Sequence, residues 1–195
     1  FEPEVEFAIR AGVANPGGDA VPGVAMDQLF GKEFALGLEL GVRATPHLHV
    51  GLFAEGAGGM AGSDFAGMSG CTGGSNCDGS SVSGRVGIQL RYHLLPYHAV
   101  DPWIAYGVAL SGAAVESPTT NGTLRRTLSG YEYAKLSAGL DFKLGRGSAL
   151  GLFAEWTAGR FTEYEDKLNG GLVSSGAISP TANHSWFTVG PRIRF

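Results

Sequence analysis

Apolar side chains alternate with polar or small ones in eight separate runs of this 195-residue chain. The second run is typical, because Phe and Leu occupy every other position and Glu33, Glu39 and Arg43 fall between them. Successive side chains of a β-strand point to opposite faces, so each run predicts a strand with one apolar and one polar face. The runs comprise residues 4–13, 33–43, 48–60, 82–93, 103–113, 133–144, 149–161 and 186–195.

The connections between the runs are alternately long and short. The long ones are rich in Gly, Ser, Thr and Asn, and they cover about residues 15–32, 61–81, 114–130 and 162–184. Each run is close to the ~9–11 residues that a tilted strand needs to cross hydrocarbon, and short turns alternate with long loops in up-and-down barrels. We therefore predict an all-β fold, an eight-stranded antiparallel up-and-down transmembrane β-barrel, with residues 1–195 as a single domain.

The charges indicate which face of each strand points inward. Within their spanning parts the apolar faces carry no Asp, Glu or Lys, whereas the opposite faces carry acids and bases in near-equal number beside Gly, Ala and Ser. A narrow eight-stranded lumen suits small and paired charged side chains, and lipid suits Leu and Phe. The apolar faces are therefore predicted to point outward.

Charges inside the lumen need partners, so we expect them to pair. The predicted lumen charge network comprises Arg10, Glu39, Glu55, Arg85, Lys135, Asp141, Glu155 and Arg192. Strand adjacency suggests the pairs Arg10–Glu39, Glu55–Arg85, Glu6 with Arg192 or Arg194, and Lys135 or Lys143 with Glu155 or Asp141. A water-filled, ion-selective channel is the alternative that the sequence leaves open.

Aromatic residues and a proline add three expectations. Residues near the ends of runs are candidates for interfacial girdles, namely Phe34, Tyr92, Trp103, Trp156, Phe161 and Trp186, with ordinary packing as the alternative. By parity Phe53, Phe153 and Phe161 point inward and are candidates to line an apolar upper lumen. Pro191 has no N–H to donate to a closed sheet, so a bulge or a water is expected there.

Composition narrows the class of protein. The net charge is -4, and no basic stripe offers phosphate contacts, which argues against nucleic acid. The sequence contains no stretch of 18 apolar residues, so it predicts no transmembrane helix. The mean hydropathy of +0.06 fits alternating strands. No positively charged start precedes an apolar stretch, so we expect a signal peptide to have been removed already.

Candidate chemistry is sparse. Cys71 and Cys77 lie in a Gly/Ser-rich segment, which favours a local disulfide over free thiols. Three weaker hypotheses are a metal at the turn histidines (His47, His49, His93, His98), calcium at Asp64, Asn76 and Asp78, and lipid hydrolysis at His184 and Ser185 with Glu163 or Glu165. Solvated turn histidines are the alternative to the first. We predict no catalytic, cofactor or metal site, and a protein that is not an enzyme.

The long connections are where binding residues are expected, since loops on a rigid scaffold usually carry them. Their acids outnumber their bases, so the surface that they form is predicted to be acidic. Four cations are candidates for contacts with lipid phosphates: Lys32, Arg125, Arg126 and Arg160.

The final segment, Trp-Phe-Thr-Val-Gly-Pro-Arg-Ile-Arg-Phe, resembles the carboxy-terminal signal strand of bacterial outer-membrane barrels. With eight alternating runs and four long loops, the chain resembles the small outer-membrane barrels of the OmpA/OmpX/OmpW type. The resemblance implies a Gram-negative outer membrane, a monomer, and partners that include outer-membrane lipid, lipopolysaccharide, the barrel assembly machinery and a surface or periplasmic protein. It also implies an assembly signal at Phe187, Val189, Ile193 and Phe195.

For function the resemblance leaves three hypotheses in order. The first is a non-enzymatic barrel with a polar, closed lumen and loops that engage a surface partner or lipopolysaccharide. The second is an OmpW-like conduit for small hydrophobic molecules. The third is a lipid-modifying outer-membrane enzyme. Fold alone does not decide among them.

Overall fold

A computed structural model describes residues 2–62, 79–119, 121–145 and 147–195 of the chain, and it is almost entirely β-structure. Its elements are β1 (Glu4–Val21), β2 (Val24–Ala25), α1 (Met26–Leu29), β3 (Phe30–Arg43), β4 (Leu48–Ala61), β5 (Ser80–His93), β6 (Val100–Thr119), β7 (Gly122–Lys143), β8 (Ala149–Leu168), β9 (Gly171–Ala177) and β10 (Asn183–Arg194). Cys71 and Cys77 lie outside the described residues, so the disulfide stays a prediction. The described residues form no helix that is long and apolar enough to cross a membrane.

Eight of these strands close into a ring. Every neighbouring pair is antiparallel, in the order β1, β3, β4, β5, β6, β7, β8 and β10, and β10 also pairs with β1. Strand β2 pairs only with β1, and β9 pairs only with β8, so both lie off the ring. The predicted eight-stranded antiparallel up-and-down barrel is confirmed.

The apolar faces point outward, as the charge pattern predicted. Along β3, Leu36, Leu38 and Leu40 are more than half exposed, whereas Glu39 between them is 2 % exposed. The predicted signal residues at the end of the chain face outward too, and the Phe195 ring stacks on Phe7 of β1 at 6.2 Å between centroids. This distribution suits a barrel whose surroundings are lipid and whose interior is polar.

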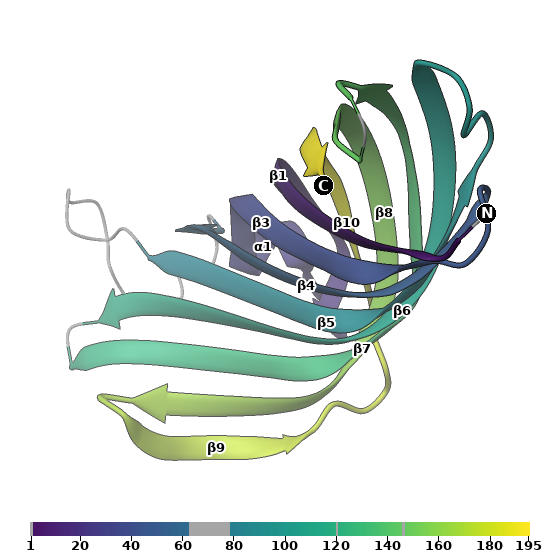
Figure 1. The fold of residues 1–195 in the computed structure, drawn as a ribbon. Coiled ribbons are helices and arrows are strands. Elements are labelled where there is room, and N and C mark those ends of the chain that lie inside the picture. Colours follow the sequence, from purple (N-terminus) through teal and green to yellow (C-terminus); the bar gives the residue numbers. More distant parts are fainter. Residues whose placement is uncertain (1, 63–78, 120, 146) are drawn as a thin grey trace.

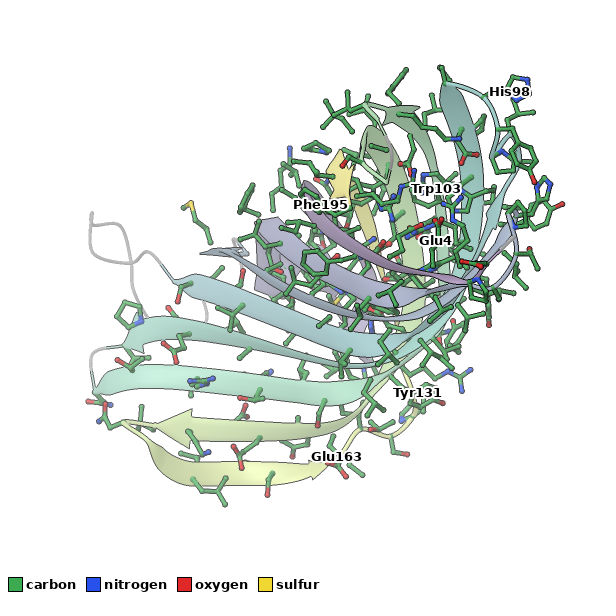
Figure 2. All side chains as sticks on the ribbon, in the orientation of Figure 1. Glu4, His98, Trp103, Tyr131, Glu163 and Phe195 are labelled. Atoms are coloured by element: carbon green, nitrogen blue, oxygen red, sulfur yellow. The ribbon has the colours of Figure 1, made fainter. Side chains whose placement is uncertain are left out.

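Two ends of the barrel differ. Three short connections, residues 44–47, 94–99 and 144–148, lie at one end, which we call the turn end. At the other, the extended end, β6, β7 and β8 run on as a curved sheet with β9 at its edge (Figure 1). His98 marks the turn end in Figure 2, and Glu163 marks the extension. We call residues 114–119, 122–129 and 163–177 the outer extension.

The extension corrects the expected loops. Residues 114–130 and 162–184 were predicted as polar loops, but most of them continue the β-ladder. Residues 15–21 likewise belong to β1. Turn-forming composition does not prevent pairing once a neighbouring strand supplies partners for the backbone N–H and C=O groups.

Pro191 causes no β-bulge, although a bulge or a water was expected there. The β1–β10 register is the same on both sides of Pro191, from Arg10↔Arg192 to Val13↔Val189. The ladder has no paired positions between these two points, and Gly190 approaches Ala11 closely there. The sheet therefore accommodates Pro191 by a local gap in the β1–β10 pairing. The backbone donor that proline lacks is missing there, but the strand register does not shift.

Candidate functional site

Arg10 of β1 lies at the centre of the barrel, where it bridges two strands that are not its neighbours. Its Nη2 lies 2.6 Å from Glu55 Oε2 on β4, and its Nη1 lies 2.6 Å from Glu155 Oε2 on β8. Glu39 on the adjacent β3 is 3.7 Å away. The guanidinium is 2 % exposed, so this cation is compensated entirely by protein carboxylates.

A second group of charges lies nearer the turn end. Arg192 of β10 contacts Asp141 at 2.8 Å and Glu39 at 3.0 Å, and it also contacts Glu6 at 3.2 Å. Arg91 of β5 pairs with both Glu6 and Glu39. Because each acid here serves more than one base, the ion pairs form a connected network across the lumen.

Trp103 belongs to this network and not to a girdle. It is 1 % exposed, its Nε1 donates to Asp141 Oδ1 at 3.1 Å, and the guanidinium carbon of Arg91 lies 4.6 Å from its ring centroid. Trp186 and Phe161 are also turned inward, so the girdle interpretation is wrong for these three. For the two tryptophans parity explains this, since Trp103 precedes the outward Ile104 and Trp186 precedes the outward Phe187.

Glycines create the room for the largest inward side chains. A Cβ on Gly37, which pairs with Arg10, would lie 2.9 Å from Arg10 Nε. A Cβ on Gly139, which pairs with Trp103, would lie 2.5 Å from Trp103 Cζ2. The lumen glycines therefore have a packing role, because a glycine on one strand leaves room for an arginine or tryptophan on the next.

The structure brings together all eight residues of the predicted lumen charge network. Glu55 pairs with Arg85 at 2.9 Å, and Lys135 pairs with Glu155 at 2.7 Å. Lys143 lies apart, because its Nζ donates to the carbonyl oxygen of Pro96. Sequence reasoning missed Glu132, which contacts Arg85 at 3.2 Å, because Glu132 fell between the predicted loop 114–130 and the predicted run 133–144.

The turn end contains a chain of polar contacts that includes a buried histidine. His93 Nδ1 lies 2.9 Å from Asp101 Oδ2, and Arg43 Nη2 lies 3.1 Å from His93 Nε2. Arg43 also contacts Glu6 at 2.9 Å. His49 and His93 are buried, so solvated turn histidines are the wrong description for these two. Among the described residues no group of three or more His, Cys, Asp or Glu is arranged to hold a metal.

The lumen changes character toward the extended end, where it is apolar. Met26 and Leu29 of α1 and Phe30 of β3 are fully buried, and they pack in one cluster with inward residues of β6, β7, β8 and β10. Phe30 meets Trp186 edge-on at 6.0 Å between centroids. In Figure 1 α1 lies within the curve of the sheet. We call residues 20–30 the loop-1 plug.

Two phenylalanines expected in the apolar upper lumen lie elsewhere. Lys135 Nζ is 4.3 Å from the centroid of the Phe53 ring, and the Arg10 guanidinium carbon is 5.0 Å from that of Phe153. Both rings therefore face cations of the charge network. Only Phe161, of the three, belongs to the apolar cluster.

His184 is buried and lies against that cluster. Its ring stacks on Phe161 at 4.0 Å between centroids, and neither ring nitrogen has a hydrogen-bond partner among the described residues. Neither Glu163 nor Glu165 is within hydrogen-bond reach of it. The acid–base pair that a hydrolase needs is therefore not assembled at this position.

The four candidate lipid-phosphate residues occupy different settings. Arg126 donates two hydrogen bonds of 2.8 Å to Asp166, and this contact raises the pKa of the guanidinium. Arg125 lies 3.0 Å from Glu116 in an exposed pair. Arg160 donates to Asn183 at 2.9 Å, beside the Tyr133 ring, and Lys32 is exposed.

Comparison with known proteins places the architecture. No protein-family model matches the chain, and no curated protein matches it. Among solved structures, Neisserial surface protein A (NspA) is 12 % identical with a TM-score of 0.57, covering 100 % of this chain and 98 % of its own. A major outer membrane protein from Thermus thermophilus is 12 % identical with a TM-score of 0.56, covering 98 % of this chain and 100 % of its own.

A third similar structure was solved with a ligand. Ail, the attachment invasion locus protein of Yersinia pestis, in complex with the heparin analogue sucrose octasulfate, is 13 % identical with a TM-score of 0.54 and covers 98 % of this chain and 99 % of its own. At such identities the likeness concerns the fold. The closed ring, the outward apolar faces and these similarities together show that this chain has the fold of the small eight-stranded outer-membrane β-barrels.

Proposed function

We propose that the chain is a non-enzymatic outer-membrane barrel with a closed lumen, and that its outer extension binds a partner at the cell surface. The observation that carries this proposal is the contrast between the two parts. The barrel interior contains paired charges and a plug, whereas the outer extension carries charged and hydroxyl side chains on its β7 and β8 segments. In this orientation the turn end is periplasmic and the extended end is outside.

Two layers support a closed lumen. Near the turn end and at mid-height the charges are joined into a network that leaves the cations compensated. Toward the extended end the loop-1 plug packs against the barrel wall. An ion would have to break buried pairs and then cross an apolar layer, and both steps are costly.

Planar-bilayer recording tests the closed lumen. We expect membranes containing the inserted protein to show little or no steady conductance, because an ion would have to separate buried ion pairs and cross the apolar plug. Insertion is checked in the same preparation by the mobility difference between unheated and heated protein on a gel. A stable, well-resolved open state would contradict the closed lumen and favour the ion-selective channel.

The surroundings of His93 argue against a catalytic role for this residue. His93 has Asp101 on one ring nitrogen, but its other nitrogen faces the Arg43 guanidinium, where a hydrolase would place a nucleophile. The partner surface is expected on the outer extension and around Lys32 and Arg160, within reach of lipopolysaccharide. Assembly through the signal residues at the end of the chain and insertion as a monomer belong to the same proposal.

Trimming the outer extension tests the surface role. Replacing residues 117–126 and 163–177 with short turns is expected to abolish attachment of the cells to their partner surface. Barrel assembly should stay intact, since the pairs of β5 with β6 and the buried Val115 and Leu128 are retained. The control is a variant that keeps the outer extension and in which only the turn-end connection, residues 94–99, is altered. If the trimmed barrel keeps every cellular phenotype of the full protein, the activity resides in the barrel.

That outcome would favour the second candidate, a conduit for small hydrophobic molecules. The observation in its favour is the apolar character of the upper lumen, which would form an apolar chamber if the loop-1 plug moved aside. The charge network beneath would block onward passage to the periplasm, so an exit through the barrel wall would be required. Faster uptake of an apolar substrate by cells carrying the trimmed barrel would support this function.

A further inference from the structure

A cavity of about 420 Å³ opens between the outer extension and the loop-1 plug. One wall is the inward face of the β7–β8–β9 sheet, with Arg126, Tyr164 and Asp166. The facing wall is apolar and comes from Val21 and Ile178. Ile178 belongs to the apolar cluster around the loop-1 plug, and Val21 packs against that cluster. The volume lies within the range of about 300–1,000 Å³ that is typical of small-ligand sites.

A β-bulge aims the polar residues into this cavity. Ser129 pairs with Glu163 and Gly130 pairs with Phe161, so Thr162 is the extra residue of β8. An extra residue reverses the alternation, and bulges often re-aim side chains next to binding sites. Beyond the bulge Tyr164 and Asp166 face inward, whereas Glu163 and Glu165 face outward.

The polar wall combines fixed donors with free acceptor sites. Arg126 uses two of its five N–H donors on Asp166, and both oxygens of Asp166 keep lone pairs for a ligand. The Tyr164 hydroxyl lies 3.2 Å from Ser174 Oγ, which fixes the phenol ring against the cavity. The site therefore offers a donor, an acceptor and an aromatic face in a rigid arrangement.

The charge of the cavity selects against anions and cations alike. The Arg126 guanidinium is neutralised by Asp166 through two hydrogen bonds, and the pair lies in a partly buried setting. The other cations of β7 and β8 nearby are paired outside the cavity, Arg125 with Glu116 and Lys167 with Glu165. A neutral ligand that carries both hydroxyl groups and an apolar face meets these conditions best.

We infer that this cavity binds a neutral sugar unit of a surface glycan. Neighbouring hydroxyls of a pyranose ring can accept from the guanidinium and donate to the carboxylate, while the C–H face of the ring packs on Tyr164 and Val21. The inference rests on the proposed surface-binding function and gives it a ligand class. The sugar can belong to lipopolysaccharide or to a glycan on another cell, since both present the same chemistry.

Titration of the full chain in lipid nanodiscs tests the inference, with methyl hexopyranosides as neutral probes and sucrose octasulfate as the anionic probe. We expect the neutral probes to bind and the anionic probe to bind more weakly. Asp166→Asn should weaken neutral binding by about tenfold and strengthen anionic binding, because a charge-assisted hydrogen bond is lost and Arg126 is left uncompensated. Tyr164→Phe, which removes one hydroxyl, should weaken neutral binding severalfold.

Glu165→Gln is the matched control, because it makes the same change in net charge on the opposite face of the same strand. Equal effects of Glu165→Gln and Asp166→Asn would overturn the inference, as would anionic preference in the native chain or binding of extended peptides with no response to any sugar. Folding of each variant is confirmed by its heat-modifiable gel mobility before titration.

Two arms identify the source of the sugar. One uses vesicles containing smooth or deep-rough lipopolysaccharide, and the other uses an array of neutral cell-surface glycans. Binding in either arm supports the inference, and binding in neither overturns it. If the full chain binds no sugar but trimming of the outer extension still abolishes attachment, the proposed surface role stands and only the sugar is wrong.

Discussion

Replacing Arg10 with alanine is expected to cost the barrel about 3–5 kcal/mol of unfolding free energy, because the change leaves buried carboxylates without their cation. Glu55 and Glu155 each lie 2.6 Å from the guanidinium, and both are almost completely buried. Urea unfolding in lipid vesicles, followed by tryptophan fluorescence and gel mobility, measures the loss.

The control for this change is Arg125→Ala. Arg125 is paired with Glu116, but its side chain is 47 % exposed, and exposed pairs contribute at most about 1 kcal/mol. Arg10→Lys should recover part of the lost stability, since it retains the charge and loses the bridging geometry. Equal shifts for Arg10→Ala and Arg125→Ala would show that the lumen network does not stabilise the barrel.

Replacing Phe30 with alanine is expected to release the loop-1 plug. Phe30 is fully buried against Trp186, and truncation of a buried phenylalanine typically costs about 3–5 kcal/mol. We expect faster proteolytic cleavage within residues 19–31 and a red shift of tryptophan emission. Both follow from water entering the space that the ring vacates.

Phe34→Ala provides the comparison from the same strand. Phe34 faces outward and is 58 % exposed, so its removal leaves the plug packing unchanged. Protection of residues 19–31 should then equal that of the native chain. If these residues are equally well protected in Phe30→Ala, the plug is held by contacts other than the apolar cluster, and the closed upper lumen loses its physical basis.

The plug and the cavity above it are linked through shared residues. Val21 and Tyr164 line the cavity and also pack against the apolar cluster that contains Met26, Leu29 and Phe30. A ligand in the cavity would therefore rest on the same apolar cluster that holds the loop-1 plug. Occupation of the cavity should raise the protection of the plug, which gives the proteolysis measurement a second use.

The sequence by itself determined the ring of strands and the face that each presents. Strand alternation has a period of two, so the runs around Leu38, Leu52 and Ile88 could point their apolar residues only to one common side. Large apolar residues on one side, with small and charged residues on the other, then indicated a membrane barrel over a soluble one. These conclusions depend on local order along the chain, which a sequence displays directly.

Strand adjacency correctly predicted the pairs Glu55–Arg85 and Lys135–Glu155, but only the tertiary structure decided which charges meet across the lumen. Pairing by strand adjacency suggested Arg10 with Glu39, yet its shortest contacts are with Glu55 and Glu155, on strands that do not touch β1 in the ladder. A narrow closed lumen brings opposite walls within side-chain reach, and no feature of the sequence reports distance across a ring. Trp103 also contacts this network from across the lumen. The absence of a side chain on Gly139 leaves the room that its ring occupies.

The tertiary structure likewise decided the extended end. A single extra residue, Thr162, reverses the alternation in β8 and turns Asp166 toward Arg126, whereas the composition of this region predicted only a polar loop. The loop-1 plug is a short apolar stretch around Met26 and Leu29 whose destination depends on the cavity that the closed barrel offers. Alternation along the chain fixes the faces of the strands, and closure of the ring fixes which side chains those faces bring together.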